Sequence, residues 1–353
     1  APRDDLAVGD DRPGALHGAV RRVVEDLGLP DHLARGRVER EDIVVDAGID
    51  EAMLTTSGVS GMDIFPILFA LASWPPSGSE GNIISASKTE VVQHIVDNTV
   101  LGEDSTSGPR VEAGVDSLTS TWADMQNEDW KPWQTKSRRG RVSVRPLVSL
   151  RDGTLIVAPH YCFASLSIYQ RYLSQGQLPW SQPEPPQLLK AALERFRDSK
   201  NRELEDTVAS VLRSNGWTVI ERIKVGGHRR LGIPVVSTEI DIVAGRSDSN
   251  RIFVLEVKDP ADVYSPSEMA RQLKEFFEDR GRKLCYATQL GRKYDELRPY
   301  PDELASALGI SARTRTVEAL FVTRHPICAA FVGSSFAFVT LKDVVATLGD
   351  SRA

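Results

Sequence analysis

Charged side chains interrupt two apolar, strand-like segments in the C-terminal half of the sequence. In residues 251–258, Glu256 and Lys258 stand two positions apart within an otherwise apolar run. Upstream, Glu239 and Asp241 open a second run at the same spacing. Residues two apart share one face of a strand. Several carboxylates and one ammonium on adjacent strands are the groups of a divalent-metal site with a catalytic lysine, because hard cations prefer oxygen ligands.

The charged pair also has a simpler interpretation. An apolar strand that is covered on both faces does not accept charges without a cost in free energy. Glu256 and Lys258 could instead pair with each other on a solvated edge strand, where such a pair contributes little. A Glu-x-Lys triplet alone is common in strands, so the elements around it must decide between the two interpretations.

Helix and strand patterns alternate from residue 188 to the end, which is typical of an α/β sheet domain. A long helix is expected first, over 188–215 and ending at Gly216. The later expected elements are strands at 218–223, 238–244 and 252–258, helices at 267–280 and 282–308, strands at 317–323 and 336–340, and a short terminal helix.

Residues 1–125 are predicted to form a mostly helical domain. Apolar residues recur at helical spacing in 15–29, 62–73 and 88–100. We find no catalytic pattern in this part of the sequence. Its expected role is recognition, regulation or binding of a partner protein, with a homodimer as one possibility.

A basic hairpin and linker module is expected over residues 126–187, between the helical domain and the sheet domain at 188–353. Segments 142–150 and 154–158 flank an Asp-Gly pair, which favours a β-hairpin turn. A helix is expected near 163–174, and the proline-rich stretch 178–186 is typical of a linker.

The order helix, three strands, helix, strand, together with these charges, resembles the PD-(D/E)xK nuclease superfamily, in particular its Mrr-like branch. In that family an acid on the first helix precedes an Asp on one strand and a (D/E)-x-K on the next. Glu205, Asp241, Glu256 and Lys258 match this pattern, and Gln272 lies on the next helix, where such members often carry a glutamine. The resemblance covers residues from about 188 onward and implies a restriction endonuclease-like three-layer domain with a central mixed sheet.

The sequence departs from the name-giving motif at two points. No proline precedes Asp241, and Glu239 stands two residues before it, so either both or only Asp241 would bind metal. Asp206 is a rival to Glu205 as the helix acid. We favour Glu205 because it borders the apolar stripe that includes Leu204, whereas Asp206 lies further toward solvent.

The resemblance implies a site that binds Mg²⁺ or Mn²⁺ and hydrolyses phosphodiester bonds. The implied metal ligands are Asp241, Glu256, the backbone carbonyl of Val257 and, for a second ion or a bound water, Glu205. Lys258 would position or help deprotonate the attacking water, since a lysine pKa responds strongly to its neighbours. Gln272 would orient Lys258 or a phosphate.

Two basic stretches could bind the nucleic-acid backbone. The first is rich in cations over 131–151, near Trp130 and Trp133, and the second joins two expected strands of the sheet domain. Their candidate contact residues are Arg138, Arg139 and Arg141 in the first stretch, and Lys224, Arg229 and Arg230 in the second. Solvated surface loops are the alternative in both cases. A further set adds to the same groove in this interpretation: Arg280, Arg282, Lys283, Arg292 and Lys293.

Composition and residue counts argue against several other classes of protein. The chain has 353 residues, a formal net charge of −6, three cysteines and six histidines. The histidines show no zinc spacing, and the N-terminus is polar, unlike a signal peptide. The cysteines are widely spaced and odd in number, which fits a reducing cytoplasm. No apolar run has the length of a membrane span, so we expect a cytoplasmic protein that does not enter a membrane.

The sequence therefore predicts a metal-dependent nuclease, with DNA as the expected substrate and a role in restriction, defence or repair. An RNA-cleaving nuclease is one alternative. The other is a catalytically inactive nucleic-acid-binding or interaction module of the same fold.

Overall fold

The computed structural model describes residues 45–75, 83–99, 107–125, 139–180, 183–263, 266–310 and 315–349. The chain divides into two compact units between Phe196 and Arg197, within helix α9 (Gln187–Ser214). Each unit has a hydrophobic core of its own. The helix expected over 15–29 lies outside the described residues.

The first unit is mainly helical. Its helices are α3 (Ala47–Ser57), α4 (Gly61–Ala72), α5 (Lys88–Asn98), α6 (Ser107–Leu118), α7 (Trp122–Met125) and α8 (Pro159–Leu173). Helices α4 and α5 confirm two of the expected helices. Ser60 and Asp63 form a capping box at the start of α4, which satisfies free amides of the first turn. Across the described ranges, no single helix is long and apolar enough to cross a membrane; α3 and α4 meet that criterion only as a pair bent by 75°.

A small sheet completes the first unit. It is built from β1 (Ile84–Ala86), β4 (Leu155–Val157), β3 (Leu147–Ser149) and β2 (Thr119–Thr121), in that spatial order. Strands β3 and β4 are antiparallel, and Gly153 at their turn has a positive φ of 86°, so the expected hairpin is confirmed. Strands this short need partners. The hairpin finds them in β1 and β2, so it shares a sheet with the residues before 125, where a separate module was expected.

The second unit is built on a five-stranded mixed sheet. The strands are β5 (Thr218–Ile223), β6 (Ile240–Gly245), β7 (Arg251–Lys258), β8 (Thr316–Thr323) and β9 (Ala337–Thr340), in that spatial order. Strands β5, β6 and β7 pair antiparallel, whereas β7, β8 and β9 pair parallel. All five lie where the sequence places them, within two residues.

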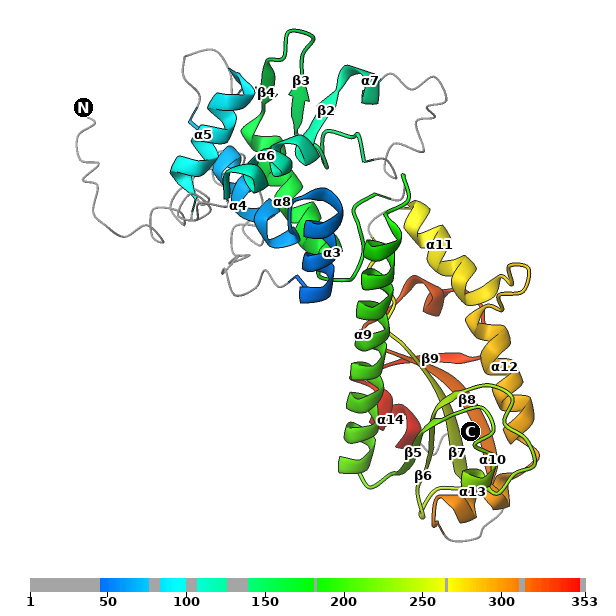
Figure 1. The fold of residues 1–353 in the computed structure, drawn as a ribbon. Helices are drawn as coiled ribbons and strands as arrows, with labels where there is room; N and C mark the ends of the chain where they lie inside the picture. Colours follow the sequence, from blue (N-terminus) through cyan, green and yellow to red (C-terminus); the bar gives the residue numbers. More distant parts are fainter. Residues whose placement is uncertain are drawn as a thin grey trace, which may run out of the picture. The chain divides into compact units, whose positions relative to one another are not determined.

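Helices cover both faces of this sheet (Figure 1). Helix α9 and α14 (Val344–Gly349) pack on one face. The other face carries α11 (Pro266–Phe277), α12 (Tyr286–Leu297) and α13 (Pro301–Ala307). The second unit is therefore an α/β domain with a central mixed sheet between helices, as the sequence predicts.

Local sequence explains the placement of α9. Leu204, Val208 and Leu212 form its buried stripe, and they pack with Phe253 of β7 in one cluster. Spacings of four residues keep such side chains on one face of a helix. After the helix ends, Gly216 adopts a positive φ of 79°, which turns the chain toward β5.

Two short helices of the second unit were not expected. Helix α10 (His228–Leu231) lies in the connection between β5 and β6, and the 3₁₀ helix η3 (Cys328–Phe331) follows β8. Both are a single turn long, and apolar periodicity cannot register over so few residues.

Candidate active site

The acidic strand residues meet at one end of the mixed sheet. Strands β6 and β7 are antiparallel, and their ladder pairs Ile242 with Leu255. Asp241 and Glu256 are each one residue further toward the same end. Their side chains are almost completely buried, with 8% of Asp241 and 1% of Glu256 exposed. Buried carboxylates need counter-charges or hydrogen-bond donors, so their partners define the site.

The regular ladder stops at Asp241. The backbone amide of Val257 donates a hydrogen bond to Oδ2 of Asp241 at 2.9 Å. Ile240 packs in the core beneath α12, whereas Ile242 packs in the core beneath α9, so the usual alternation of strand faces breaks between them. Because of this irregularity, the Asp241 carboxylate points along the sheet toward β7, where it accepts the hydrogen bond from Val257.

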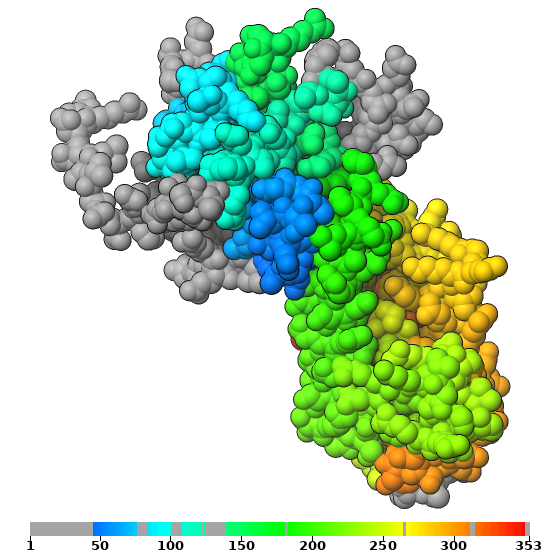
Figure 2. Space-filling model, in the orientation of Figure 1, coloured from blue at the N-terminus to red at the C-terminus, as the bar shows by residue number. Residues whose placement is uncertain are grey.

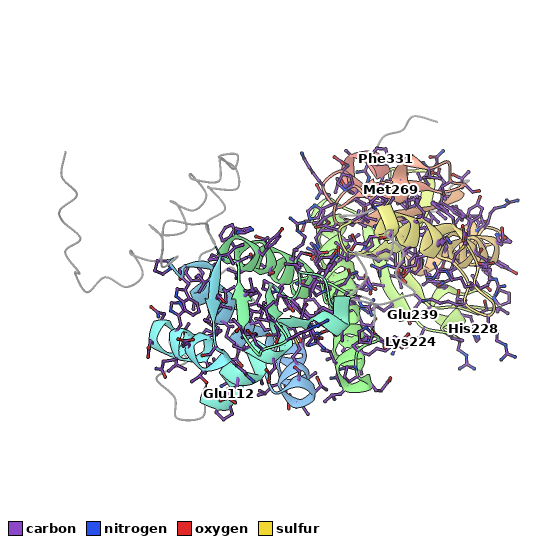
Figure 3. All side chains as sticks on the ribbon, turned by 90° about the horizontal axis from the view of Figure 1, so that it is seen from above. Glu112, Lys224, His228, Glu239, Met269 and Phe331 are labelled. Atoms are coloured by element: carbon purple, nitrogen blue, oxygen red, sulfur yellow. The ribbon has the colours of Figure 1, made fainter. Side chains whose placement is uncertain are left out.

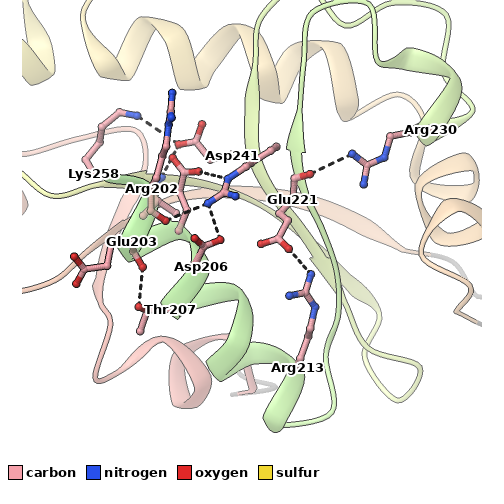
Figure 4. Close-up of polar contacts among 12 residues, drawn as sticks. Arg202, Glu203, Asp206, Thr207, Arg213, Glu221, Arg230, Asp241 and Lys258 are labelled. Atoms are coloured by element: carbon pink, nitrogen blue, oxygen red, sulfur yellow. Dashed lines mark hydrogen bonds and ion pairs between the residues drawn. The ribbon is translucent and has the colours of Figure 1, made fainter. Parts of the chain in front are cut away.

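Lys258 binds both carboxylates. Its Nζ lies 2.8 Å from Oε1 of Glu256 and 3.4 Å from Oδ2 of Asp241, and it sits 5.3 Å from the ring centroid of Tyr286. Burial by itself lowers the pKa of Lys258, but the negative charges of Glu256 and Asp241 outweigh it and raise the pKa. Lys258 is therefore held as an ammonium between the two carboxylates, and its contact with Asp241 is drawn in Figure 4.

A second lysine, Lys293 of α12, completes the cluster. Its Nζ lies 3.4 Å from Oδ1 of Asp241 and forms a close ion pair with Oε2 of Glu256. Only 4% of Lys293 is exposed. The sequence placed Lys293 among cations of an open groove, and this was wrong. The signal that could have found it is its position between Leu290 and Leu297 in the buried stripe of α12.

Helix α9 contributes the acid that approaches from the opposite face. The Glu205 side chain is 15% exposed, whereas that of Asp206 is 61% exposed. Burial and the negative charge of Asp241 raise the pKa of Glu205. Glu205 is thus the helix acid that is electrostatically coupled to the strand site, in agreement with the preference drawn from the apolar stripe.

Arg222 of β5 holds both helix acids. Its Nε lies 3.3 Å from Oε2 of Glu205, and its Nη2 lies 2.6 Å from Oδ1 of Asp206. Arg222 also has a positive φ of 52°, a backbone conformation that side chains with a Cβ rarely adopt. The β5–β6 ladder pairs Glu221 with Ile242 and Ile223 with Ile240, and it skips Arg222 and Asp241 between them. Arg222 therefore lies opposite Asp241 in a strained backbone conformation, and strained residues of this kind cluster at functional sites.

The end of β7 is fixed against α9 by polar contacts. The amide of Asp259, the residue after Lys258, donates to Oδ1 of Asn201 at 2.9 Å. Arg324, beyond β8, donates through Nε to Oδ2 of Asp259 at 2.8 Å. These bonds connect α9, β7 and β8 where the charged cluster lies.

Three other predicted site residues lie elsewhere or play another part. Glu239 is exposed, outside the cluster (Figure 3). Gln272 is buried, and its Oε1 accepts the amide of Cys328 at 3.1 Å, so it positions η3; no hydrogen bond among the described residues links it to Lys258. Val257 contributes its amide to Asp241, while a role for its carbonyl as a ligand stays a prediction.

The donor set fits a divalent cation in part. Asp241 and Glu256 direct one oxygen each to a shared cation, the ammonium of Lys293. Two such carboxylates are hard ligands of the kind that Mg²⁺ and Mn²⁺ prefer. Within the described ranges, however, no three His, Cys, Asp or Glu side chains converge closely enough to hold a metal ion. Glu205 therefore does not join Asp241 and Glu256 in a three-carboxylate cluster in this structure.

Exposed cations lie on the connection between β5 and β6. Lys224, Arg229 and Arg230 are all exposed, and Arg230 donates to the backbone oxygen of Glu221 at 3.3 Å. This connection, residues 224–239, occupies a broad part of the surface of the second unit (Figure 2). Lys224 directly follows Ile223, whose ladder partner is Ile240, next to Asp241. The basic connection therefore leaves the sheet at the end that carries the cluster.

The other basic stretch is not an open surface where the structure describes it. Arg138 lies outside the described residues. The Arg139 guanidinium lies 4.9 Å from the ring centroid of Trp180, and burial together with Arg145 lowers its pKa. Arg141 donates to the backbone oxygen of Pro179. Both arginines thus pack within the first unit, and nucleic-acid contact by them stays a prediction.

Searches of protein-family models, of curated proteins and of solved structures found no match to this chain. The resemblance to PD-(D/E)xK nucleases therefore rests on the residues and the geometry described above.

Proposed function

We propose that this protein is a metal-dependent nuclease of the PD-(D/E)xK type that cleaves DNA. One observation carries the proposal. Asp241 of β6 and the Glu256-Val257-Lys258 segment of β7 meet at one end of a mixed sheet, and the acid Glu205 of α9 is electrostatically coupled to Asp241 and Lys258. These are the positions that the family motif requires.

The order of elements supports the same assignment. A helix that carries an acid, α9, precedes the antiparallel strands β5, β6 and β7, and three helices, α11, α12 and α13, follow before the parallel strand β8. This is the succession expected of a restriction endonuclease-like domain. Fold alone does not establish an activity, so the proposal depends on the charged cluster.

The residues of the site have distinct roles in this proposal. Asp241 and Glu256 would hold Mg²⁺ or Mn²⁺, which supplies electrostatic stabilisation of the phosphate and activation of water when bound. Lys258, held as an ammonium, donates hydrogen bonds to the water or to a phosphate oxygen and stabilises negative charge. Lys224, with its neighbours on the β5–β6 connection, binds the backbone of the nucleic acid.

A cleavage assay with three variants tests the proposal. The protein is incubated with supercoiled, linear, single-stranded and branched DNA and with RNA, in Mg²⁺ or Mn²⁺. Asp241→Ala and Lys258→Ala should abolish cleavage while binding is retained. Glu239→Ala is the matched control, because it removes an exposed acid two residues from Asp241 and should leave cleavage unchanged.

The outcomes separate the alternatives. Cleavage that survives both Asp241→Ala and Lys258→Ala would place the activity elsewhere. Cleavage of RNA alone would correct the substrate and keep the site.

A second function is favoured by one observation. The two lysines already neutralise Asp241 and Glu256 within the protein. Such compensation also suits a non-catalytic nucleic-acid-binding module in which the cluster stabilises the fold. Folded protein that binds DNA but cleaves no substrate in either metal would support this function.

A further inference from the structure

Lys293 occupies a position where an apolar residue would be expected. The structure describes α12 from end to end, and its buried residues are Leu290, Lys293 and Leu297. At this spacing the three side chains form one stripe that faces the sheet. A lysine in such a stripe loses side-chain entropy and hydration, so it needs specific partners to offset these costs.

Its partners are the two carboxylates of the candidate metal site. Lys293 binds Oδ1 of Asp241 at 3.4 Å and pairs closely with Oε2 of Glu256. Lys258 takes the remaining oxygens, Oδ2 of Asp241 and Oε1 of Glu256. Each carboxylate therefore lies between two ammonium groups, one from β7 and one from α12.

The charges of this cluster balance only because of Lys293. The Glu-x-Lys segment supplies one ammonium for two buried carboxylates, which would leave an uncompensated negative charge. Buried ions of this kind are strongly destabilising unless paired. A bound divalent cation would supply the missing positive charge, and here Lys293 supplies it from the protein itself.

We propose that Lys293 is a built-in counter-ion that competes with a divalent cation for Asp241 and Glu256. This inference rests on the proposed function, because it assumes that the two acids form the metal site. Metal binding is then coupled to withdrawal of the Lys293 ammonium from between them, which the flexible lysine side chain permits. In the metal-free protein, Lys293 keeps the two carboxylates paired, and it thereby weakens their affinity for a metal ion.

Lys293→Met tests this competition, since it removes the charge and keeps an unbranched side chain. Mn²⁺ binding is measured by isothermal titration calorimetry without nucleic acid. Lys293→Met should bind Mn²⁺ at least about tenfold more tightly than the wild type, because a buried negative charge is left for the cation to neutralise. Arg292→Met, an exposed neighbour on α12, is the matched control and should bind like the wild type.

A measurement on the unmodified chain covers the case in which Lys293→Met does not fold. The Nζ resonance of Lys293 is followed by nitrogen-15 NMR and assigned by its loss in Lys293→Arg. Addition of Mg²⁺ should shift this resonance toward that of a solvated lysine. In Asp241→Asn the same addition should leave it unchanged.

The results distinguish failure of this inference from failure of the proposed function. Equal Mn²⁺ affinity of the wild type and Lys293→Met, at a site that Asp241→Asn abolishes, would overturn the competition and leave the metal site intact. An unchanged Lys293 resonance while Mg²⁺ binds would do the same. Absence of any Asp241-dependent metal binding in both proteins would overturn the metal site itself, and this inference with it.

Discussion

The backbone amide of Val257 donates a hydrogen bond to Oδ2 of Asp241 at 2.9 Å. A side-chain carboxylate thus occupies the place where the ladder between β6 and β7 would continue. The bond fixes the direction of the carboxylate, so that Oδ1 lies toward Lys293 of α12. The geometry of the site is therefore set by the backbone of the sheet as well as by its charged side chains.

Removal of Glu256 should cost the protein much of its stability. Glu256→Ala leaves the ammonium groups of Lys258 and Lys293 buried beside a single carboxylate, Asp241. Breaking a buried ion pair in this way costs about 3–5 kcal/mol of unfolding free energy. Urea denaturation of the wild type and of Glu256→Ala measures this difference in unfolding free energy.

The partly exposed pair of Arg251 and Glu318 provides the comparison. Glu318→Ala should lower the unfolding free energy by no more than about 1 kcal/mol, as is usual for ion pairs near the surface. Equal losses in Glu256→Ala and Glu318→Ala would show that the cluster has no special energetic role.

Glu205 should make stability fall as the pH rises. Burial first, and then Asp241, raise the pKa of Glu205 above its ordinary value of 4.5. Between the ordinary and the raised pKa, the folded protein keeps a proton that the unfolded chain releases, so folding becomes less favourable with increasing pH. Glu205→Gln should therefore be more stable than the wild type at neutral pH and similar to it near pH 4, as measured by denaturant unfolding.

The neighbouring Glu203 gives a control of opposite sign. Its pKa is lowered, mainly by the hydrogen bond from Lys200, so its contribution is present above the ordinary pKa and lost as the pH falls. Glu203→Gln should be slightly less stable than the wild type at neutral pH. A stabilising effect of both substitutions would contradict the assignment of Glu205 as a buried, coupled acid.

Substitutions of Arg222 should separate backbone strain from side-chain pairing. Arg222→Ala and Arg222→Gly both remove the contacts to Glu205 and Asp206, but only glycine adopts a positive φ without steric cost. Arg222→Gly should therefore be more stable than Arg222→Ala by about 1 kcal/mol in thermal or denaturant unfolding.

At Arg213, in the last turn of α9, the same two substitutions should show the opposite order, because glycine weakens helices. If Arg222→Gly were the less stable of the pair, the positive φ would not be a source of strain.

The β5–β6 connection should bind DNA through its charges. Replacing Lys224, Arg229 and Arg230 by Ala should weaken binding and reduce the slope of log affinity against log salt by about 3, since each phosphate contact contributes close to one. Fluorescence anisotropy at several salt concentrations measures this slope.

Arg213→Ala is the control for that experiment. Arg213 is a half-exposed cation in the last turn of α9, outside the β5–β6 connection, and its Nη2 pairs with Oε1 of Glu221 at 2.8 Å. It should leave the salt slope unchanged. An unaltered slope in the triple variant would show that these three cations do not contact the phosphate backbone.

Much of the second unit could be predicted because its signals are local. Apolar runs of strand length and the stripe of Leu204, Val208 and Leu212 specify the elements, and Gly216 marks where α9 gives way to β5. Strand β5 was predicted at 218–223 and is observed at those residues. The short helices α10 and η3 carry no such periodic signal, and they were missed.

The candidate site likewise contains residues that the sequence could predict and contacts that it could not. Asp241, Glu256 and Lys258 stand out in the sequence because charges interrupt apolar strands. Gln272 matched a family position, yet in the structure its side chain binds the amide of Cys328. A hydrogen bond between residues 56 positions apart depends on how α11 and η3 pack, and no local pattern specifies it.

The sequence by itself determined the types of residue at the site, because a buried strand tolerates charge only for a specific reason. The tertiary structure decided how those charges are balanced. Lys293 is 37 residues from Glu256, and only the packing of α12 on the sheet brings its ammonium between Asp241 and Glu256. Electrostatic energy depends on distance in space and on burial, and neither can be read from the spacing of residues along the chain.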